Sequence, residues 1–213
     1  MKGSDYRIDC ITAGHVQTNT YLLSSGGESI IIDPGTYIGE LLQKLNIGDS
    51  KVVAIIATHG HFDHIMDGQE LKTKLGSPFI IGSGEDDILD WSYRISERYL
   101  PRKLTRISVD RYLDDGDIVE FGMHRLNVMK VPGHTAGSLI LVIGNTMFTG
   151  DTLFRENIGR TDLGGSMESM RQSLLRLMKL GSDYRVLPGH GEETTLSHEL
   201  AYNPFLLELK AED

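Results

Sequence analysis

Apolar residues in the first half of the chain fall into short runs separated by turn signals. Residues 52–57 form a continuous apolar run of strand length, which is typical of a strand covered on both faces. Residues 29–32 run into the turn sequence Asp33-Pro34-Gly35. The pattern predicts strands at 6–11, 18–24, 28–33, 52–57 and 78–82, and helices at 37–46 and about 64–75.

The second half begins after a mixed, charged region at 84–112, which we interpret as an irregular or helical excursion. Its start at 84–87 has the acidic pattern of a solvated turn and helix start, and Trp91 is interpreted as core in preference to a lid. The pattern then predicts strands at 117–121, 123–131, 138–143, 145–149 and 184–188, and helices near 166–180 and 197–209.

Each half therefore consists of strands followed by helix. This order favours two mixed β-sheets packed together with helices outside, a four-layer αββα sandwich of the α/β class, over a doubly wound parallel sheet. At 213 residues, with no low-complexity linker, the chain is expected to form one domain over 1–213.

Composition and charge narrow the classes of function. The chain has 39% apolar and 24% charged residues, and no stretch approaches the ~18 apolar residues of a membrane helix. The N-terminus lacks the apolar run of a secretory signal, so we expect a cytoplasmic location. The formal charge of −9 disfavours nucleic acid as a partner. A small-molecule substrate remains, with the chain acting as a monomer or a homodimer.

Cys10 is the only cysteine, which excludes an intramolecular disulfide and a zinc site built on cysteines of this chain. Any metal site must therefore use histidine and carboxylate. Cys10 itself lies in the strand-like run 6–11, where we expect a small apolar core residue in preference to a nucleophile.

The segment 58–64, Thr-His-Gly-His-Phe-Asp-His, packs three imidazoles and one carboxylate directly after an apolar run. If the segment is extended, His59, His61 and Asp63 project to one side, while His64 opens the following helix and points elsewhere. One loop could then serve two neighbouring metal positions. Imidazole and carboxylate suit zinc, iron or manganese. The alternative is a polar loop that happens to be rich in histidine.

Three further potential ligands, His134, Asp151 and His190, each follow an apolar strand and a glycine. Glycine permits the tight backbone that turns a ligand back over the sheet edge. This repetition disfavours the alternative that the segment 58–64 is only a polar loop that happens to be rich in histidine. The histidines at 15, 124 and 198 have no such neighbours and are interpreted as surface or hydrogen-bonded side chains.

These residues resemble the motif series of the metallo-β-lactamase superfamily, which is matched by Asp33, the HxHxDH segment at 59–64, His134, Asp151 and His190. Within that superfamily the chain is most similar to the glyoxalase II group of thioester hydrolases, in particular the short forms without an added C-terminal helical domain. The runs that carry this likeness are 132–138, 150–154 and 203–206. The resemblance implies an αββα fold and a two-metal centre.

The resemblance also implies a role for each residue. The first metal would be held by His59, His61 and His134, and the second by Asp63, His64 and His190. Asp151 would bridge both, Asp33 would support the ligands from outside, and Asp63 is also expected to be catalytic. Two divalent cations, zinc first with iron or manganese as alternatives, would lie about 3.5–4 Å apart, share a hydroxide and lower its pKa toward ~7. That hydroxide would attack a thioester or ester carbonyl.

Arg160 lies in the loop 157–162, roughly at the place of a basic substrate contact in the glyoxalase II group. It is expected to bind a carboxylate, with a solvated surface arginine as the alternative. In full-length glyoxalase II much of the glutathione contact surface lies on the C-terminal helical domain, for which this chain leaves no room. The likeness to the glyoxalase II group nevertheless makes an acylglutathione-like thioester the expected substrate class.

Other functions remain open. Persulfide dioxygenases, which use a single iron, also carry HxHxDH and share the 159–162 loop. A lactonase or another ester hydrolase of the same fold is a further alternative, because the pocket walls set the substrate. A non-catalytic metal-binding protein is the third reading.

Overall fold

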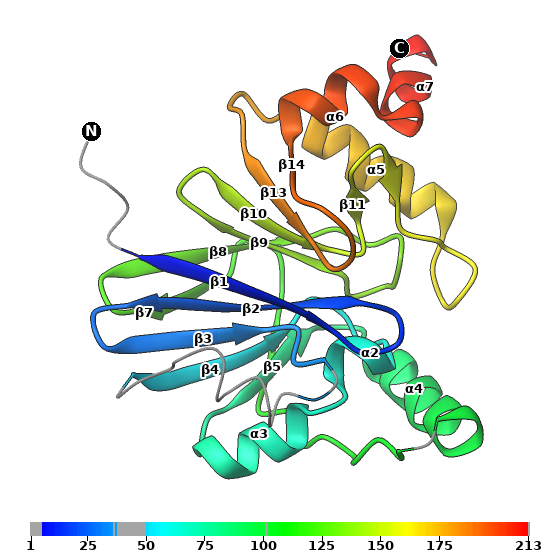
Figure 1. Ribbon diagram of the computed structural model, residues 1–213. Coiled ribbons are helices and arrows are strands. Elements are labelled where there is room, and N and C mark those ends of the chain that lie inside the picture. Colours follow the sequence, from blue (N-terminus) through cyan, green and yellow to red (C-terminus); the bar gives the residue numbers. More distant parts are fainter. Residues whose placement is uncertain (1–5, 36, 38–49, 101, 213) are drawn as a thin grey trace.

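Residues 6–35, 37, 50–100 and 102–212 are described by the computed structural model. Two six-stranded sheets lie face to face, with helices on both outer sides (Figure 1). The predicted four-layer αββα sandwich is therefore confirmed. The helix predicted over 37–46 lies, apart from residue 37, outside the described residues.

The first sheet comes from the first half of the chain, in the order β1-β2-β3-β4-β5-β6. Its strands are β1 (Arg7–Ala13), β2 (Thr18–Ser25), β3 (Glu28–Ile32), β4 (Lys51–Ala57), β5 (Phe79–Gly82) and β6 (Arg111–Leu113). β1, β2 and β3 pair antiparallel, whereas β3, β4, β5 and β6 pair parallel. The carboxyl ends of these four parallel strands therefore lie at the same edge.

The second sheet has the order β14-β13-β10-β9-β8-β7. Its strands are β7 (Ile118–Phe121), β8 (His124–Lys130), β9 (Leu139–Ile143), β10 (Thr146–Gly150), β13 (Arg185–Pro188) and β14 (Thr194–Thr195). β9 is antiparallel to both β8 and β10, and β13 is parallel to β10. The strands β8, β10 and β13 thus run in one direction and end at one edge. β11 (Leu153–Phe154) and β12 (Asn157–Ile158) form a separate small ribbon.

Three apolar clusters separate the four layers. The two-residue period of the strands shows in β4, where Ile56 packs between the sheets while Ile55 and Ala57 face the outer helices. A third cluster lies between the second sheet and the helices on its outer face. Burial on both faces explains why the strand at 52–57 has an uninterrupted apolar run.

The helices cover the two outer faces. α2 (Phe62–Ile65), α3 (Gly68–Leu75) and α4 (Asp86–Tyr99) lie on the side of the first sheet, and α5 (Met167–Met178), α6 (Leu196–Tyr202) and α7 (Pro204–Glu212) on that of the second (Figure 1). No helix in these described ranges has both the length and the apolar character needed to span a membrane.

Two predicted helices are interrupted. The helix expected near 197–209 divides at Asn203, whose backbone is extended because the residue before a proline disfavours the helical region. The helix expected at 64–75 divides between α2 and α3, where the Asp67 amide donates to the carbonyl of Pro34. The region 84–112 contains α4, an irregular stretch over 102–110 and the start of β6, so it is helical in its first half and irregular in its second.

Cys10 does not lie in the core as expected. It is exposed on β1, which is the edge strand of the first sheet and has a mostly half-buried, alternating pattern. The strand-like run at 6–11 does not tell whether the strand will lie in the middle of a sheet or at its edge, where one side has no neighbour.

The two sheets approach closely where β5 ends, and this contact requires glycine. A Cβ at Gly82 would lie 1.9 Å from the carbonyl oxygen of Gly137, whereas a Cβ at Gly181 meets nothing within 4 Å. We expect Gly82→Ala to lower the free energy of unfolding by about 1–3 kcal/mol. Gly181→Ala should leave it unchanged or raise it by up to about 1 kcal/mol. Urea denaturation compares the two, and equal stabilities would contradict this account.

Candidate metal centre

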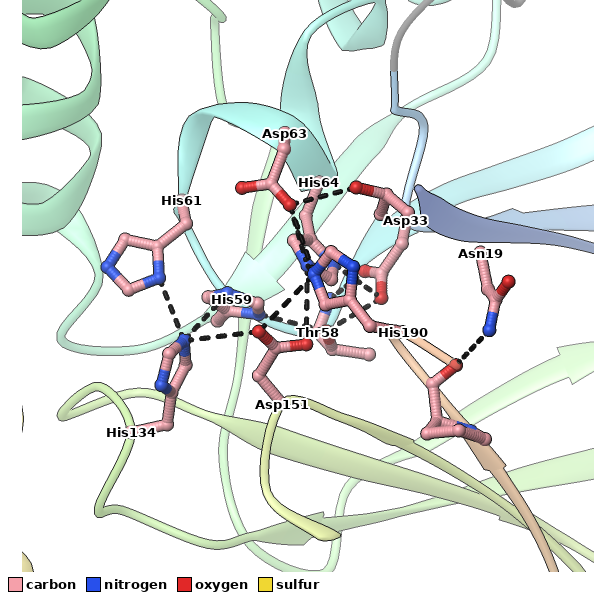
Figure 2. Close-up of polar contacts among 12 residues, drawn as sticks. Asn19, Asp33, Thr58, His59, His61, Asp63, His64, His134, Asp151 and His190 are labelled. Carbon is pink, nitrogen blue, oxygen red and sulfur yellow. Dashed lines mark hydrogen bonds and ion pairs between the residues drawn. The ribbon is translucent and has the colours of Figure 1, made fainter. Parts of the chain in front are cut away.

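The carboxyl ends of strands from both sheets meet at one edge of the sandwich. β4, β8, β10 and β13 each end shortly before a predicted ligand. Figure 2 shows these side chains pointing toward one another across the two sheets. The structure thereby brings together all seven predicted metal ligands, namely His59, His61, Asp63, His64, His134, Asp151 and His190.

The HxHxDH segment is not extended throughout, contrary to the sequence-based expectation. α2 begins at Phe62, directly after the extended residue His61. Asp63 therefore lies on this helix together with His64, and it groups with His64 and not with His59 and His61. The start of α2 divides the segment between two groups of ligands.

The first ligand group consists of His59, His61 and His134. His61 Nδ1 lies 2.8 Å from His134 Nε2, which lies 3.2 Å from His59 Nε2. All three residues are buried. Three imidazole nitrogens thus converge on one point, from a loop of the first sheet and a loop of the second.

The second ligand group consists of Asp63, His64 and His190. His64 Nε2 and His190 Nε2 are 3.2 Å apart, and Asp63 Oδ2 lies 3.3 Å from the former and 3.2 Å from the latter. This group combines two imidazoles with a carboxylate and lies beside the cleft that opens to solvent.

Asp151 lies between the two groups. Its Oδ2 is 3.6 Å from His134 Nε2 and 3.5 Å from His190 Nε2, and its Oδ1 is 3.4 Å from His64 Nε2. Oδ1 is buried, yet no donor among the described residues meets it with hydrogen-bond geometry. A buried carboxylate oxygen in that position fits a cation better than it fits a dry protein interior.

The outward nitrogens of the ligand imidazoles contact carbonyl oxygens. His134 Nδ1 lies 2.6 Å from the carbonyl oxygen of Arg160, and His61 Nε2 lies 3.1 Å from that of Leu163. A carbonyl only accepts, so these nitrogens carry the proton, and a neutral imidazole has only one. The inward nitrogens therefore carry lone pairs.

The same arrangement recurs at His190, whose Nδ1 donates to the carbonyl of Val16 at 3.0 Å. Lone pairs held about 3 Å apart repel one another unless a cation lies between them, and zinc–nitrogen bonds of about 2.0–2.1 Å place ligand nitrogens at such separations. The residues present therefore fit a pair of divalent cations.

Asp33 connects the two groups from behind. Its Oδ1 accepts a hydrogen bond from the Thr58 amide at 2.6 Å, and its Oδ2 accepts one from Thr58 Oγ1 at 2.8 Å. Thr58 Oγ1 in turn lies 3.2 Å from His59 Nδ1, and Asp33 Oδ2 lies 3.0 Å from His64 Nδ1. Asp33 thus orients one histidine of each group, in agreement with the expected outer support.

The first ligand group is held neutral by its surroundings. Burial, as the largest cause, lowers the pKa of His59 well below its usual value, that of His61 to about 4, and that of His134 as well. Repulsion between neighbouring imidazoles adds to the effect at His59 and His61. Neutral imidazole is the form that binds a metal.

The second ligand group is balanced between opposite charges. Burial alone would lower the pKa of His64, but the carboxylates of Asp63, Asp151 and Asp33 outweigh it and hold the pKa well above the usual value. Burial alone would raise the pKa of Asp63, but attraction by His64 and a hydrogen bond from His190 hold it well below. Positive charge is therefore favoured at this position.

The glycines before the ligands are required by close approach of the backbone. A Cβ at Gly150 would lie 2.3 Å from Thr58 Oγ1, and a Cβ at Gly189 would lie 2.3 Å from Asp151 Oδ1. Gly150 also has a positive φ of 48°. Any larger residue would push the strand ends, and with them the ligands, apart.

A cleft of about 700 Å³ opens over the ligands. Its apolar wall includes Trp91, Phe154 and Leu163, and its polar wall includes Arg155, Asn157 and Arg160. The Trp91 ring lies 5.4 Å from that of His61. The side chain of Trp91 thus borders the cleft and is only half-buried, so its interpretation as a core residue was wrong.

Arg160 contributes to the centre through its backbone. The carbonyl accepts from His134, as described above, while the exposed guanidinium forms a two-point ion pair with Asp162, with two distances of 2.6 Å. A role of this side chain in substrate binding stays a prediction.

Sequence reasoning missed three residues that hold the ligand segments. Thr18 Oγ1 donates to Asp63 Oδ2 at 2.8 Å, and Asn19 Nδ2 donates to the carbonyl oxygen of Pro188 next to the His190 loop (Figure 2). Glu85 is completely buried, so the assignment of 84–87 to a solvated turn was wrong at this residue. All three are ordinary polar residues in sequence, and only long-range contacts distinguish them.

Comparison with known proteins agrees with this geometry. The sequence model of the metallo-beta-lactamase superfamily matches residues 13–190. Hydroxyacylglutathione hydrolase GloC of Haemophilus influenzae is 33% identical over 213 residues, which cover 93% of this chain and 97% of that protein.

Two solved structures are similar over almost their whole length. The BLEG-1 B3 metallo-beta-lactamase has a TM-score of 0.85 and 32% identity, over 94% of this chain and 99% of its own. TTHA1623, determined in a di-iron-bound form, has a TM-score of 0.83 and 32% identity, over 93% of this chain and 100% of its own. The matched region contains both ligand groups, and the chain belongs to the metallo-beta-lactamase superfamily.

Proposed function

We propose that this protein is a metal-dependent hydrolase of thioesters, with acylglutathione or a related acyl thiol as its substrate class and two divalent cations, zinc first, as its cofactors. The observation that carries the proposal is the convergence of two ligand groups around the shared carboxylate Asp151. The likeness to GloC, a hydroxyacylglutathione hydrolase, favours a thioester over other substrates of this superfamily.

In this proposal His59, His61 and His134 hold one cation, Asp63, His64 and His190 hold the other, and Asp151 contacts both. Bound together, two cations supply an activated water and positive charge for the carbonyl oxygen of the substrate. The surroundings prepare the site by keeping one histidine group neutral and by directing His61, His64, His134 and His190 inward through contacts with Asp33 or with backbone carbonyls.

The cleft suits a substrate with an apolar acyl part and a polar carrier. Trp91 and Phe154 offer apolar surface on either side of the ligands, while Arg155 and Asn157 offer hydrogen-bond donors. Among the described residues that line the cleft there is no serine, threonine or cysteine. Water is therefore the nucleophile that this site can use, and Cys10 on β1 plays no part.

The first prediction concerns turnover. The purified protein should hydrolyse S-lactoylglutathione, and a chelator should abolish the reaction, which zinc should then restore. Asp151→Asn should lower kcat/KM at least about 100-fold because it removes the charge shared by both positions. Asp87→Asn, an identical change at an exposed residue of α4, serves as the control. The proposal fails if no thioester in a panel shows chelator-sensitive turnover.

A second candidate is an oxygen-dependent persulfide dioxygenase with a single iron. It is favoured by the ligand chemistry, which also suits iron. TTHA1623, whose structure was determined in a di-iron-bound form, supports iron as the metal but not a single ion. A lactonase or another ester hydrolase would use the same centre with different pocket walls.

Metal content separates these candidates. Protein purified without added metal should contain two divalent ions per chain and take up no oxygen with glutathione persulfide. Elemental analysis and an oxygen electrode make the two measurements. One iron per chain together with oxygen uptake would replace the hydrolase proposal by the dioxygenase.

The opposite pKa shifts of the two groups predict different pH dependence of metal affinity. His190→Ala leaves the first group, whose histidines stay neutral as the pH falls toward the pKa of His61, about 4. His61→Ala leaves the second group, where His64 binds a proton already above its usual pKa. Zinc must displace that proton, so the zinc affinity of the His61→Ala variant should decrease about tenfold for each unit by which the pH is lowered below the pKa of His64.

Competition with a chromophoric chelator between pH 8 and pH 5 measures both profiles. We expect the affinity of the His190→Ala variant to stay nearly level over a range in which that of the His61→Ala variant already declines. If the zinc affinities of the two variants changed in parallel with pH, the first ligand group would not be neutral while the second is charged, and the assignment would be wrong.

A further inference from the structure

Glu85 is a buried carboxylate that belongs to neither ligand group. It lies at the N-terminal end of α4 and is 0% exposed. Short polar side chains such as aspartate often cap a helix from this position, but Glu85 accepts no hydrogen bond from α4 as a cap. Its side chain points instead toward the loops after β4 and before β9. Burial of a carboxylate is costly unless its oxygens are hydrogen-bonded, so its contacts require an explanation.

The two oxygens of Glu85 bind two loops that are far apart in sequence. Oε2 accepts from the amide of Gly60 at 2.6 Å, and Oε1 accepts from the amide of Gly137 at 2.7 Å. Gly60 lies between His59 and His61, in the loop after β4. Gly137 lies three residues after a ligand of the opposite sheet, in the loop before β9. One carboxylate thus spans the two loops that together form the first ligand group.

The fit leaves little space for adjustment. A Cβ at Gly60 would lie 3.0 Å from Glu85 Oε2, and one at Gly137 would lie 2.8 Å from Glu85 Oε1. α4 holds Gly60 a second time, since Ser92 Oγ donates to the carbonyl oxygen of Gly60 at 2.8 Å. The loop that carries His59 and His61 is therefore fixed on α4, and Glu85 links it to the loop of His134.

The second ligand group has separate supports. Asn19 Nδ2 donates to the carbonyl oxygens of Pro188 and Gly191, both at 3.0 Å, and so spans the loop that carries His190. Thr18 on the same strand donates to Asp63. Since β2 holds one group and α4 the other, the loss of one support should act on one metal position.

We propose that Glu85 is a positioning residue that sets the distance between His134 and the His59–His61 loop, and thereby controls the affinity of the first metal position without affecting the second. This inference rests on the proposed two-cation centre. Replacement by glutamine keeps the size of the side chain but offers one acceptor oxygen, so one of the two backbone amides loses its partner. Groups that orient metal ligands in this way typically change metal affinity about 10–100-fold.

The test measures zinc binding at each metal position separately, in variants that lack one ligand of the other position. Glu85→Gln is introduced into the wild type, into His190→Ala, which keeps the first group, and into His61→Ala, which keeps the second. Zinc affinity of each metal-free protein is measured by competition with a chromophoric chelator, and stability by thermal unfolding. We expect E85Q to weaken zinc binding at least about tenfold beside His190→Ala and less than about twofold beside His61→Ala. Asn19→Ala is the matched control and should give the reverse pattern.

A merely structural role of Glu85 would lower the unfolding temperature and weaken zinc binding equally in both backgrounds, or leave binding unchanged, and either result overturns the inference. If the wild type binds no zinc, the proposed centre itself fails. If E85Q does not fold, Glu85→Asp, which is one methylene shorter and reaches only one amide, is taken through the same titrations. If neither folds without metal, Glu85 is a determinant of folding and the inference is overturned.

Discussion

The centre depends on one constraint, namely that lone pairs and carboxylates are held facing one another at about 3 Å in a buried place. Such groups repel or stay unsatisfied on their own, so the surrounding structure has to hold them there. The inward nitrogens of His61 and His134, 2.8 Å apart, are held by carbonyls on their outward sides. The rest of the support comes from the sheets, since the rigid carboxyl ends of β4, β8, β10 and β13 fix where each ligand loop begins.

The two ligand groups solve this constraint differently. Burial keeps the first group neutral, so it offers three lone pairs and no charge. The second group places His64 among three carboxylates, which raises its pKa and lets a proton occupy the place of a cation. Asp151 contacts both groups and Asp33 backs both. Two adjacent positions of different character therefore share their central and rear supports.

The ligand set and the layers could be predicted from sequence because both are local signals. An apolar run that ends at glycine and a ligand marks a strand end, and repetition of this pattern at His134 and His190 indicated convergence. The division of the HxHxDH segment by α2 could not be predicted, because the pattern does not fix the residue at which a helix begins. An extended segment would have placed Asp63 beside His59 and His61, whereas the family resemblance grouped it with His64 and His190, as the structure does. The burial of Glu85 and the exposure of Cys10 depend on distant neighbours, which no local pattern contains.

The second ligand group is held by segments from both ends of the chain, through supports that sequence reasoning missed. Thr18 and His190 form a β-bridge, and Asn19 holds the loop that follows β13. A strand from the beginning of the chain thus positions a ligand from its end. The first group, in contrast, is held by α4 and the loops of β4 and β9 in the middle of the chain. Loosening of the terminal segments should therefore disturb the charged position before the neutral one, because Thr18 and Asn19 on β2 support only the second group, although Asp33 and Asp151 are common to both.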